Sequence, residues 1–362
     1  MAAGASPDIV ETAAEARALE QPPLLVLDSV RAFMDEHRLG SGRLGARVVG
    51  EGRSNFTFLI QRDNGRYVLR RPPRPPYPRS AHDVAREARL QIALRPLGIR
   101  VAAVRAICDD EAVLGVPFYV MDFIDGEVIT DRLPPPLERD VASRHRLMDD
   151  LVDVLAEIHG CDVTDAALAA FARSGSYLER QVRRFTELWP LNATRELPVV
   201  DEVARRLAAE LPAPVPETVV HGDFRLGNMI VAADDPTRIL AALDWEMGAI
   251  GDPRADVGYL LATYAEPGGS ASLIGGSAAT AVEGFPSKAE LVARYVERTG
   301  REQGQLEWFV GFALWKAAVF CEAIYGRYLR GELAAGDESA EVFRDGVPQM
   351  AEAAVRALDS PL

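Results

Sequence analysis

Polar side chains in the second half of the chain have the types and the spacing that phosphoryl transfer requires. Asp223 lies in a His-Gly-Asp run, and Asn228 follows it by five residues. Asp244 comes later, at the start of an Asp-Trp-Glu run. A carboxylate can act as a base toward a hydroxyl, and an amide oxygen beside a second carboxylate suits a hard cation such as Mg²⁺. Phosphoryl-transfer enzymes place a base and a metal ligand at the spacing of Asp223 and Asn228.

A predicted hairpin brings two of these residues together. The strand patterns at residues 229–232 and 239–243 are separated by an Asp-Asp-Pro turn sequence. Because a hairpin brings its open ends together, Asn228 and Asp244 should be neighbours in space. Taken singly, each carboxylate is better explained as a turn cap or an ordinary strand-end residue. The full set favours a site for phosphoryl transfer.

The same motifs resemble the aminoglycoside phosphotransferase/choline kinase-like family, in which His-Gly-Asp replaces the His-Arg-Asp of protein kinases. The resemblance implies that Asp223 is the catalytic base that orients and deprotonates an acceptor hydroxyl. It implies that Asn228 and Asp244 hold Mg²⁺ on the phosphates of ATP. By the same resemblance His221 supports the loop rather than doing chemistry, and Asp256 buttresses the loop by accepting backbone hydrogen bonds.

The resemblance also assigns nucleotide contacts to the N-terminal half. A glycine-bearing turn between two strand patterns could cover phosphates with its backbone N–H groups, although a plain hairpin turn looks the same. Its residues are Gly50, Gly52, Ser54 and Asn55. Arg70 stands where the family usually places a phosphate-gripping lysine. Arg71 faces the other way along the strand, so we favour Arg70. Glu87, on the next helix, would pair with that cation unless it is a solvated surface residue.

A hinge between the two expected lobes would bind the adenine. Backbone groups of Asp122 and Ile124 are the implied partners of the base. The Val-Leu-Arg-Arg-Pro-Pro run at residues 68–73 is similar to the kinase domains of acyl-CoA dehydrogenase family members 10 and 11 and their stand-alone bacterial relatives. The family resemblance covers most of the chain, from about residue 48 to 329.

Hydrophobic patterning predicts an α+β fold, and the family resemblance implies that it forms two lobes like those of protein kinases. We expect a flexible tail at residues 1–22, a nucleotide-binding lobe at 23–124, and a catalytic and acceptor-binding lobe at 125–362. The first lobe should hold a five-stranded, mostly antiparallel sheet and a helix at 82–94. The second should be largely helical. Its expected helices are 147–158, 177–188, 200–209, 288–299 and 307–329, and residues 268–279 are the best candidate for a mobile loop.

Composition excludes several classes of function. The 362-residue chain has a net charge of −14, which argues against nonspecific nucleic-acid binding. No sequence stretch approaches the roughly 20 consecutive apolar residues of a membrane span, and the N-terminus has no signal-like core. The three cysteines show no metal or disulfide spacing. We expect a cytoplasmic protein, either a monomer or a homodimer.

The acceptor is left open by the motifs. The acyl-CoA dehydrogenase resemblance favours a hydroxyacyl-CoA, such as a 4-hydroxyacyl-CoA. An aminoglycoside or other antibiotic is the alternative, and it predicts an acidic acceptor cleft. A non-catalytic nucleotide-binding pseudokinase is favoured only by the arginine at position 70. His159 is expected to pack or cap a helix. Lys316, Tyr325 and Arg327 could reach an acceptor cleft, but a structural or solvated role is favoured for them.

Overall fold

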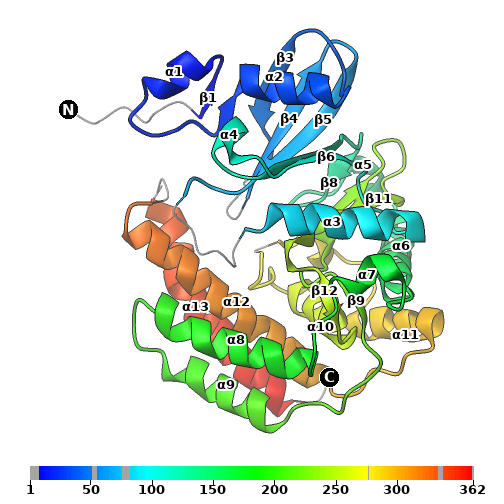
Figure 1. The fold of residues 1–362 in the computed structure, drawn as a ribbon. Helices are drawn as coiled ribbons and strands as arrows, with labels where there is room; N and C mark the ends of the chain where they lie inside the picture. Colours follow the sequence, from blue (N-terminus) through cyan, green and yellow to red (C-terminus); the bar gives the residue numbers. More distant parts are fainter. Residues whose placement is uncertain (1–7, 51–54, 76–81, 276, 333–336, 361–362) are drawn as a thin grey trace. The chain divides into compact units, whose positions relative to one another are not determined.

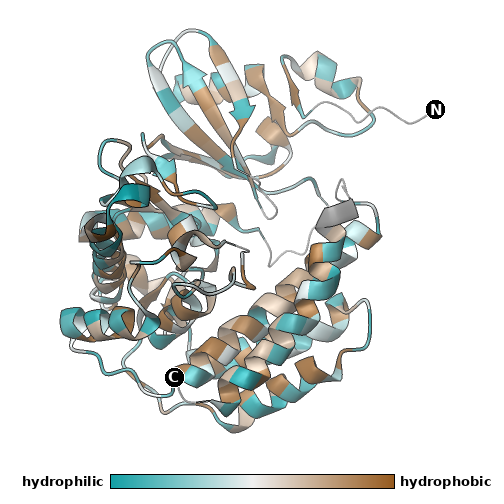
Figure 2. Ribbon diagram, turned by 180° about the vertical axis from the view of Figure 1, so that it is seen from behind, coloured by the Kyte–Doolittle hydropathy of each residue, from teal (hydrophilic) through white to brown (hydrophobic). Residues whose placement is uncertain are grey.

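The computed structural model describes residues 8–50, 55–75, 82–275, 277–332 and 337–360. It divides into two compact units, Met1–Asp125 and Gly126–Leu362. Hydrophobic residues run through the helices and strands of both (Figure 2), so each unit can bury a core of its own.

The N-terminal unit is built on the predicted five-stranded antiparallel sheet (Figure 1). Its spatial order is β3-β4-β5-β7-β6. The Asn-Gly turn at residues 64–65 joins the second and third strands of this sheet, β4 and β5, as the sequence predicts. The strands are β3 (Leu44–Val48), β4 (Phe56–Arg62), β5 (Gly65–Arg71), β6 (Val104–Cys108) and β7 (Phe118–Asp122).

Helices cover the two faces of this sheet. The helix α2 (Leu27–Glu36) buries Val30 and Met34 in a core that includes Leu69 of β5. The helix α3 (Val84–Leu94) packs with Val68, the neighbouring residue of β5. Because side chains alternate along a strand, residues 68 and 70 face α3, whereas 69 and 71 face α2. A short helix, α4 (Glu111–Leu114), lies between β6 and β7.

The chain ahead of α2 differs from the flexible tail that we expected. From Asp8 onward it carries β1 (Ile9–Val10), which pairs in parallel with β2 (Leu25–Val26), and the short helix α1 (Ala13–Arg17). Thr12 and Glu15 form a capping box at the start of α1. Alternation over two residues is too short a pattern to be read from sequence, which explains the difference.

The C-terminal unit is mainly helical. Four of its long helices, α8, α9, α12 and α13, pack together (Figure 1). Each predicted helix is present, but the last helix, the one at residue 254 and the short helices at residues 135 and 166 were not expected. The helices are α5 (Pro135–Arg139), α6 (Val141–His159), α7 (Ala166–Ala169), α8 (Tyr177–Asn192), α9 (Pro198–Ala209), α10 (Arg254–Thr263), α11 (Lys288–Thr299), α12 (Leu306–Leu329) and α13 (Asp337–Asp359).

The helix α12 is the centre of this unit. By length and composition it could cross a membrane, but 72% of its most apolar stretch is buried inside the protein. Its buried residues lie on all sides of the helix, a pattern found in the core helices of large globular proteins. Charged residues within it therefore need an explanation.

Short strands position the polar motifs. The predicted hairpin is formed by β10 (Met229–Val231) and β11 (Ile239–Ala242), and β8 (Glu127–Val128) adds a third strand. A second pair joins β9 (Thr218–Val220) to β12 (Ala249–Gly251). The His-Gly-Asp run follows β9 directly, so its position is set by this small sheet.

The glycine-rich segment at 268–279 is tied to its surroundings at several points. Gly268 N donates to Ala281 O over 2.7 Å, and Ser272 Oγ donates to Ala262 O over 3.0 Å. These bonds tie described residues of the segment to Ala281 and to the end of α10. The mobility of the segment stays a prediction.

Candidate active site

A single buried carboxylate holds the loop that follows β9. Asp256, in the first turn of α10, has no exposed surface. Its Oδ2 accepts a hydrogen bond from His221 N at 2.6 Å, and its Oδ1 accepts one from Gly222 N at 2.7 Å. Burial acts to raise the Asp256 pKa, but the hydrogen bonds from the His159 side chain and the His221 backbone act against it, and the pKa lies below its ordinary value. Asp256 therefore stays ionised and anchors the loop.

The glycine of the His-Gly-Asp run is required by geometry. Gly222 has a φ of +84°, in the left-handed region. A Cβ at this position would lie 2.7 Å from the Met247 Cβ and 2.8 Å from the Met247 carbonyl oxygen. Both the backbone conformation and the lack of space exclude a larger residue.

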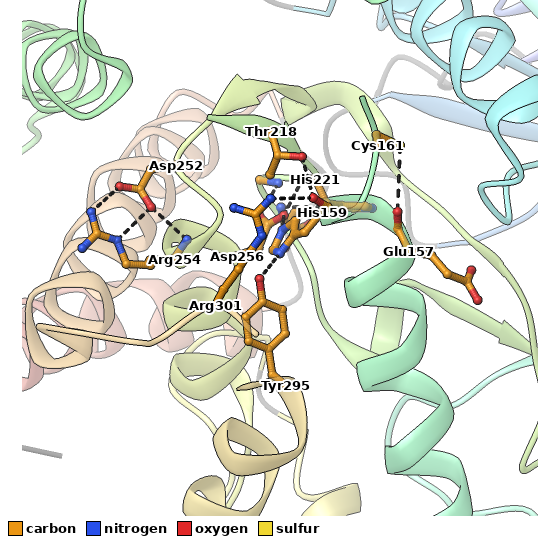
Figure 3. Close-up of polar contacts among 12 residues, drawn as sticks. Glu157, His159, Cys161, Thr218, His221, Asp252, Arg254, Asp256, Tyr295 and Arg301 are labelled. Carbon is orange, nitrogen blue, oxygen red and sulfur yellow. Dashed lines mark hydrogen bonds and ion pairs between the residues drawn. The ribbon is translucent and has the colours of Figure 1, made fainter. Parts of the chain in front are cut away.

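Hydrogen bonds connect Asp256 to residues of two further helices (Figure 3). His159, the last residue of α6, places its Nε2 3.2 Å from Asp256 Oδ2. Its Nδ1 lies 2.6 Å from the hydroxyl of Tyr295 on α11. All three side chains are buried. The expected packing role of His159 is thus a hydrogen-bonded one, which links α6 and α11 to the loop.

His221 is a structural part of the loop. Its Nδ1 accepts a hydrogen bond from Asp223 N at 3.2 Å, and its Nε2 donates to Leu243 O at 2.8 Å. One accepting and one donating nitrogen fit the neutral ring with the hydrogen on Nε2. The ring is fully buried, with its centroid 4.6 Å from that of Trp245. His221 thereby connects the start of the loop to the end of β11.

The two carboxylate oxygens of Asp223 differ, because one accepts a hydrogen bond within the protein and the other accepts none from the described residues. Asn228 Nδ2 donates to Asp223 Oδ2 and to Asp223 O, both over 2.8 Å. Asp223 Oδ1 is buried and makes no hydrogen bond with any described residue. The nearest cation is Arg225, whose Nε lies 3.6 Å from that oxygen. The carboxylate is therefore fixed in orientation while Oδ1 can still accept a proton from a ligand.

Asp244 stands at the matching end of the hairpin. Leu243 N donates to Asn228 O over 2.7 Å, which places Asn228 beside the start of the Asp-Trp-Glu run. The hairpin thus brings together the two segments that we expected to meet. Asp244 has a φ of +63°, uncommon for a residue with a side chain. Such strain is concentrated at functional sites.

The side-chain oxygens of Asn228 and Asp244 fit Mg²⁺ only if other oxygen ligands complete its coordination. No group of three or more His, Cys, Asp or Glu side chains that could hold a metal occurs in the described part of the chain. Both amide hydrogens of Asn228 are directed at Asp223, which leaves its Oδ1 as an acceptor. One amide oxygen and the Asp244 carboxylate form a small hard-oxygen set, the kind that binds Mg²⁺ together with substrate phosphates.

In the N-terminal unit, the neighbouring residues Arg70 and Arg71 make hydrogen bonds with different partners. Arg70 Nε donates to Glu87 Oε2 over 3.1 Å. Glu87 is 1% exposed, which excludes a solvated surface role, and its Oε1 accepts from the Tyr119 hydroxyl at 3.2 Å. Arg71 is buried and donates to the backbone oxygens of Leu24 and Pro72. The pairing of the cation with the helix carboxylate is present, and Arg71 is engaged on the opposite face.

The glycine-bearing turn is described only at its two ends. Gly50 has a φ of +76°. Asn55 is 3% exposed, and its Oδ1 lies 3.1 Å from His82 Nδ1, so its side chain is directed into the protein. Gly52 and Ser54 lie outside the described residues, and their assignment stays a prediction.

The two hinge residues occupy the end of β7 and the chain after it. The Asp122 side chain makes two hydrogen bonds with Arg105, at 2.7 and 2.6 Å. Asp122 N donates to Ala103 O, so an adenine contact by this residue would use its carbonyl oxygen. Ile124 is half-buried against the cluster that includes Val68.

Sequence reasoning missed groups that come from other elements. Tyr259 on α10 lies near Asp223, and burial together with the negative charge of Asp223 raises the Tyr259 pKa. Its position three residues after Asp256, one turn along the helix, was the available signal. Arg225 lies within the motif itself, two residues after Asp223. Lys316 was considered but assigned a structural or solvated role.

Comparison with known proteins places this geometry among phosphotransferases. Residues 45–307 match the model of a family described as the phosphotransferase enzyme family. The chain is 30% identical to mouse acyl-CoA dehydrogenase family member 11 over 319 residues, which cover 86% of this chain and 41% of that protein. It is 31% identical to mouse acyl-CoA dehydrogenase family member 10 over 283 residues, covering 78% and 26% respectively. The chain thus spans about two fifths, or less, of these relatives.

Solved structures show the same fold. A crystal structure from Ralstonia eutropha JMP134, provisionally assigned as an aminoglycoside phosphotransferase, matches with a TM-score of 0.75 and 29% identity, covering 92% of this chain and 98% of that one. Spectinomycin phosphotransferase, in complex with ADP and spectinomycin, matches with a TM-score of 0.57 and 13% identity, covering 92% and 99%. These findings confirm the resemblance inferred from the motifs and the kinase-like α+β fold.

Proposed function

The chain belongs to the phosphotransferase enzyme family, and we propose that it transfers the γ-phosphate of ATP to a hydroxyl of a small molecule. The observation that carries the proposal is the state of Asp223. One oxygen is held by Asn228, and the other is buried without a hydrogen bond. A carboxylate fixed in this way is suited to receive a hydroxyl proton.

In the proposed reaction, the acceptor hydroxyl donates a hydrogen bond to Asp223 Oδ1. The hydroxyl oxygen attacks the γ-phosphorus, its proton passes to Asp223, and the bond from phosphorus to the bridging oxygen breaks, so that ADP leaves with the electron pair. Mg²⁺ held by Asn228 and Asp244 would neutralise charge on the phosphates. His221 and Asp256 keep the loop in place, since their hydrogen bonds are made without a ligand.

For the nucleotide, we assign the contacts to the N-terminal unit. Arg70 would grip the phosphates, with Glu87 fixing its orientation through the 3.1 Å hydrogen bond. Backbone groups of the turn at residues 50–55 would cover the phosphates, and those of Asp122 and Ile124 would pair with adenine. We further propose that the reaction takes place in the cytoplasm.

As the acceptor we propose a hydroxyacyl-CoA, such as a 4-hydroxyacyl-CoA. The support is the identity of about 30% to acyl-CoA dehydrogenase family members 10 and 11. Phosphorylation turns a hydroxyl into a leaving group, a useful step before elimination. An aminoglycoside is the second candidate, supported by the structure from Ralstonia eutropha at 29% identity.

The test is magnesium-dependent ATP consumption by the purified protein. The acceptors are 4-hydroxypentanoyl-CoA, 4-hydroxypentanoate and kanamycin. Asp223→Asn keeps the shape of the side chain and should abolish turnover, while ATP binding persists. Asp234→Asn, an exposed position in the turn of the neighbouring hairpin, is the matched control and should keep wild-type activity. ATP binding without turnover on any acceptor would favour a nucleotide-binding protein without catalysis.

A further inference from the structure

Lys316, at the middle of α12, is a buried cation without a polar partner. The residue is 5% exposed. It makes no hydrogen bond or ion pair with any residue that the structure describes. Its Nζ lies 5.2 Å from the ring centroids of both Phe185 and Phe312. The rings offer only a weak electrostatic partner for the ammonium group.

The buried arginines Arg254 and Arg144 of this unit, by contrast, make several hydrogen bonds with described residues. Arg254 bonds to both carboxylate oxygens of Asp252 and to the carbonyl oxygen of Ala213. Arg144 donates to three backbone carbonyl oxygens. Desolvating a charge without hydrogen bonds costs free energy that the fold ordinarily recovers from such partners. Lys316 therefore departs from the treatment of comparable groups nearby, which suggests that its partner is a ligand.

Lys316 lies within electrostatic reach of the proposed base, on a helix that packs against the one carrying Asp256. The negative charges of Asp256 and Asp223 both act on its ammonium group, and Arg184 of α8 acts against it. α12 packs directly on α10, the helix that carries Asp256 and Tyr259 (Figure 1). Neither carboxylate comes within ion-pair distance of Nζ.

We propose that Lys316 binds a negatively polarised oxygen of the acceptor, either a carboxylate or a thioester carbonyl, close to the hydroxyl that Asp223 deprotonates. This inference rests on the proposed phosphotransfer function and specifies the class of its acceptor. Arg184 adds positive charge near the amine of Lys316, and Arg225 Nε lies 3.6 Å from Asp223 Oδ1. These positive charges attract an anionic or carbonyl-bearing hydroxy compound and repel a polycation such as an aminoglycoside.

A purely structural role makes the opposite predictions. If Lys316 serves only to pack between two phenylalanine rings, its replacement should lower stability and leave acceptor affinity unchanged. Lys316→Met keeps a long, unbranched side chain while removing the charge. Lys288→Met is the matched control, because Lys288 is a half-buried lysine on α11 outside the site.

The first experiment measures kcat and KM for 4-hydroxypentanoyl-CoA and 4-hydroxypentanoate. Loss of one charged hydrogen bond should raise the acceptor KM of Lys316→Met about tenfold or more. The KM of Lys316→Met for ATP should stay unchanged and its melting temperature should not fall, and Lys288→Met should keep all wild-type constants. An effect on the CoA ester alone identifies the thioester as the bound group, and an effect on the free acid identifies the carboxylate. An unchanged acceptor KM for both compounds would overturn the proposal.

A second experiment separates this inference from the phosphotransfer proposal. Calorimetric titration of the same two compounds and of kanamycin, without ATP, measures binding whether or not a phosphoryl group is transferred. Wild-type binding of an acyl compound that Lys316→Met weakens about tenfold supports the anion subsite even if no turnover occurs. Equal binding by both proteins, no binding by the wild type, or tight binding of kanamycin alone would each contradict it.

Discussion

Two groups of buried charge lie close together in the C-terminal unit, and the fold treats them in opposite ways. The anchor consists of Asp256, His159, Tyr295 and the backbone of His221 and Gly222, and every contact in it is short. The open groups are the buried Asp223 Oδ1, which makes no hydrogen bond with a described residue, and the amine of Lys316, whose contacts in the described part of the chain are two phenylalanine rings. A satisfied buried charge specifies the position of the backbone. An unsatisfied one is retained at a cost, and a binding or catalytic role accounts for that cost.

This difference separates two consequences of mutation. Removing an anchor group should lower stability and activity together, because the loop position depends on it. Removing an open group should change activity or affinity while stability holds or rises, because no internal bond is lost. The predictions below test this distinction, from the largest effect to the smallest.

The largest effect is expected from Asp223→Asn. The amide cannot take up the hydroxyl proton, so kcat should fall by about a thousandfold, equivalent to roughly 4 kcal/mol. The unfolding free energy in urea should stay within about 0.5 kcal/mol of wild type, because Asp223 Oδ1 has no hydrogen bond to lose. A loss of stability on the scale of an anchor mutation would mean that Asp223 belongs to the anchor.

Asp256→Asn should instead destabilise the protein. The amide would keep at most one of the two backbone hydrogen bonds and would leave a donor against a backbone N–H group. We expect the unfolding free energy at pH 7 to fall by about 3 kcal/mol, with kcat reduced as well. Urea denaturation with Asp234→Asn as control measures this. Loss of activity at unchanged stability would show that Asp256 does not anchor the loop.

The same carboxylate predicts a dependence on acid. The Asp256 pKa is lowered in the folded protein, so its stabilising effect is complete above the unfolded-state pKa of about 3.9 and is lost as the pH falls through the folded-state pKa. The stability difference between wild type and Asp256→Asn should therefore be constant from pH 7 to about pH 5 and shrink below about pH 4. A difference that shrinks already near pH 6 would assign the titration to a histidine.

Lys316→Met should raise stability. Burial lowers the Lys316 pKa to about 8. The negative charges of Asp256 and Asp223 act to raise this pKa, and the positive charge of Arg184 acts to lower it. The unfolded chain binds this proton more tightly, so the charged amine destabilises the fold below pH 8, and the penalty fades as the pH rises toward 10.5. At pH 7 the variant should gain about 1 to 3 kcal/mol, measured in urea, and the gain should shrink above pH 8. A destabilised variant would place Lys316 among the structural groups.

Local sequence determined much of the site. The Asn-Gly turn and the Asp-Asp-Pro turn each fix a hairpin, so the pairing near Asn228 could be predicted from spacing alone. Alternation along β5 separated Arg70 from Arg71, and the Arg70–Glu87 contact follows from a strand facing the next helix. These are contacts between neighbouring elements of the chain.

The groups that escaped prediction come from distant elements. Tyr295 reaches His159 across 136 residues, and Lys316 acts on Asp223 from a helix that starts 83 residues later. Helical periodicity tells which residues of α12 are apolar, but this helix is buried on all sides, so its pattern has no preferred face. Whether a lysine in such a helix finds a partner depends on packing that one sequence does not encode locally.

The smallest expected effect tests the outer edge of the anchor. Tyr295→Phe removes the hydroxyl that lies 2.6 Å from His159 Nδ1 but keeps the ring. Because Nε2 of His159 faces a carboxylate, that nitrogen carries hydrogen, and in the neutral ring Nδ1 accepts the proton of Tyr295. The variant should lose about 1 kcal/mol of unfolding free energy, and kcat should change by less than about twofold, since the Asp256 bonds to His221 and Gly222 remain. Tyr264→Phe, which loses a hydroxyl bond to Pro286 O outside the anchor, is the matched control for stability. Tyr295→Phe could lower kcat far more than Tyr264→Phe at an equal loss of stability. In that case the hydrogen bonds of Tyr295 and His159 control the reacting groups, and Tyr295 would belong with the residues that affect activity rather than with those that affect stability alone.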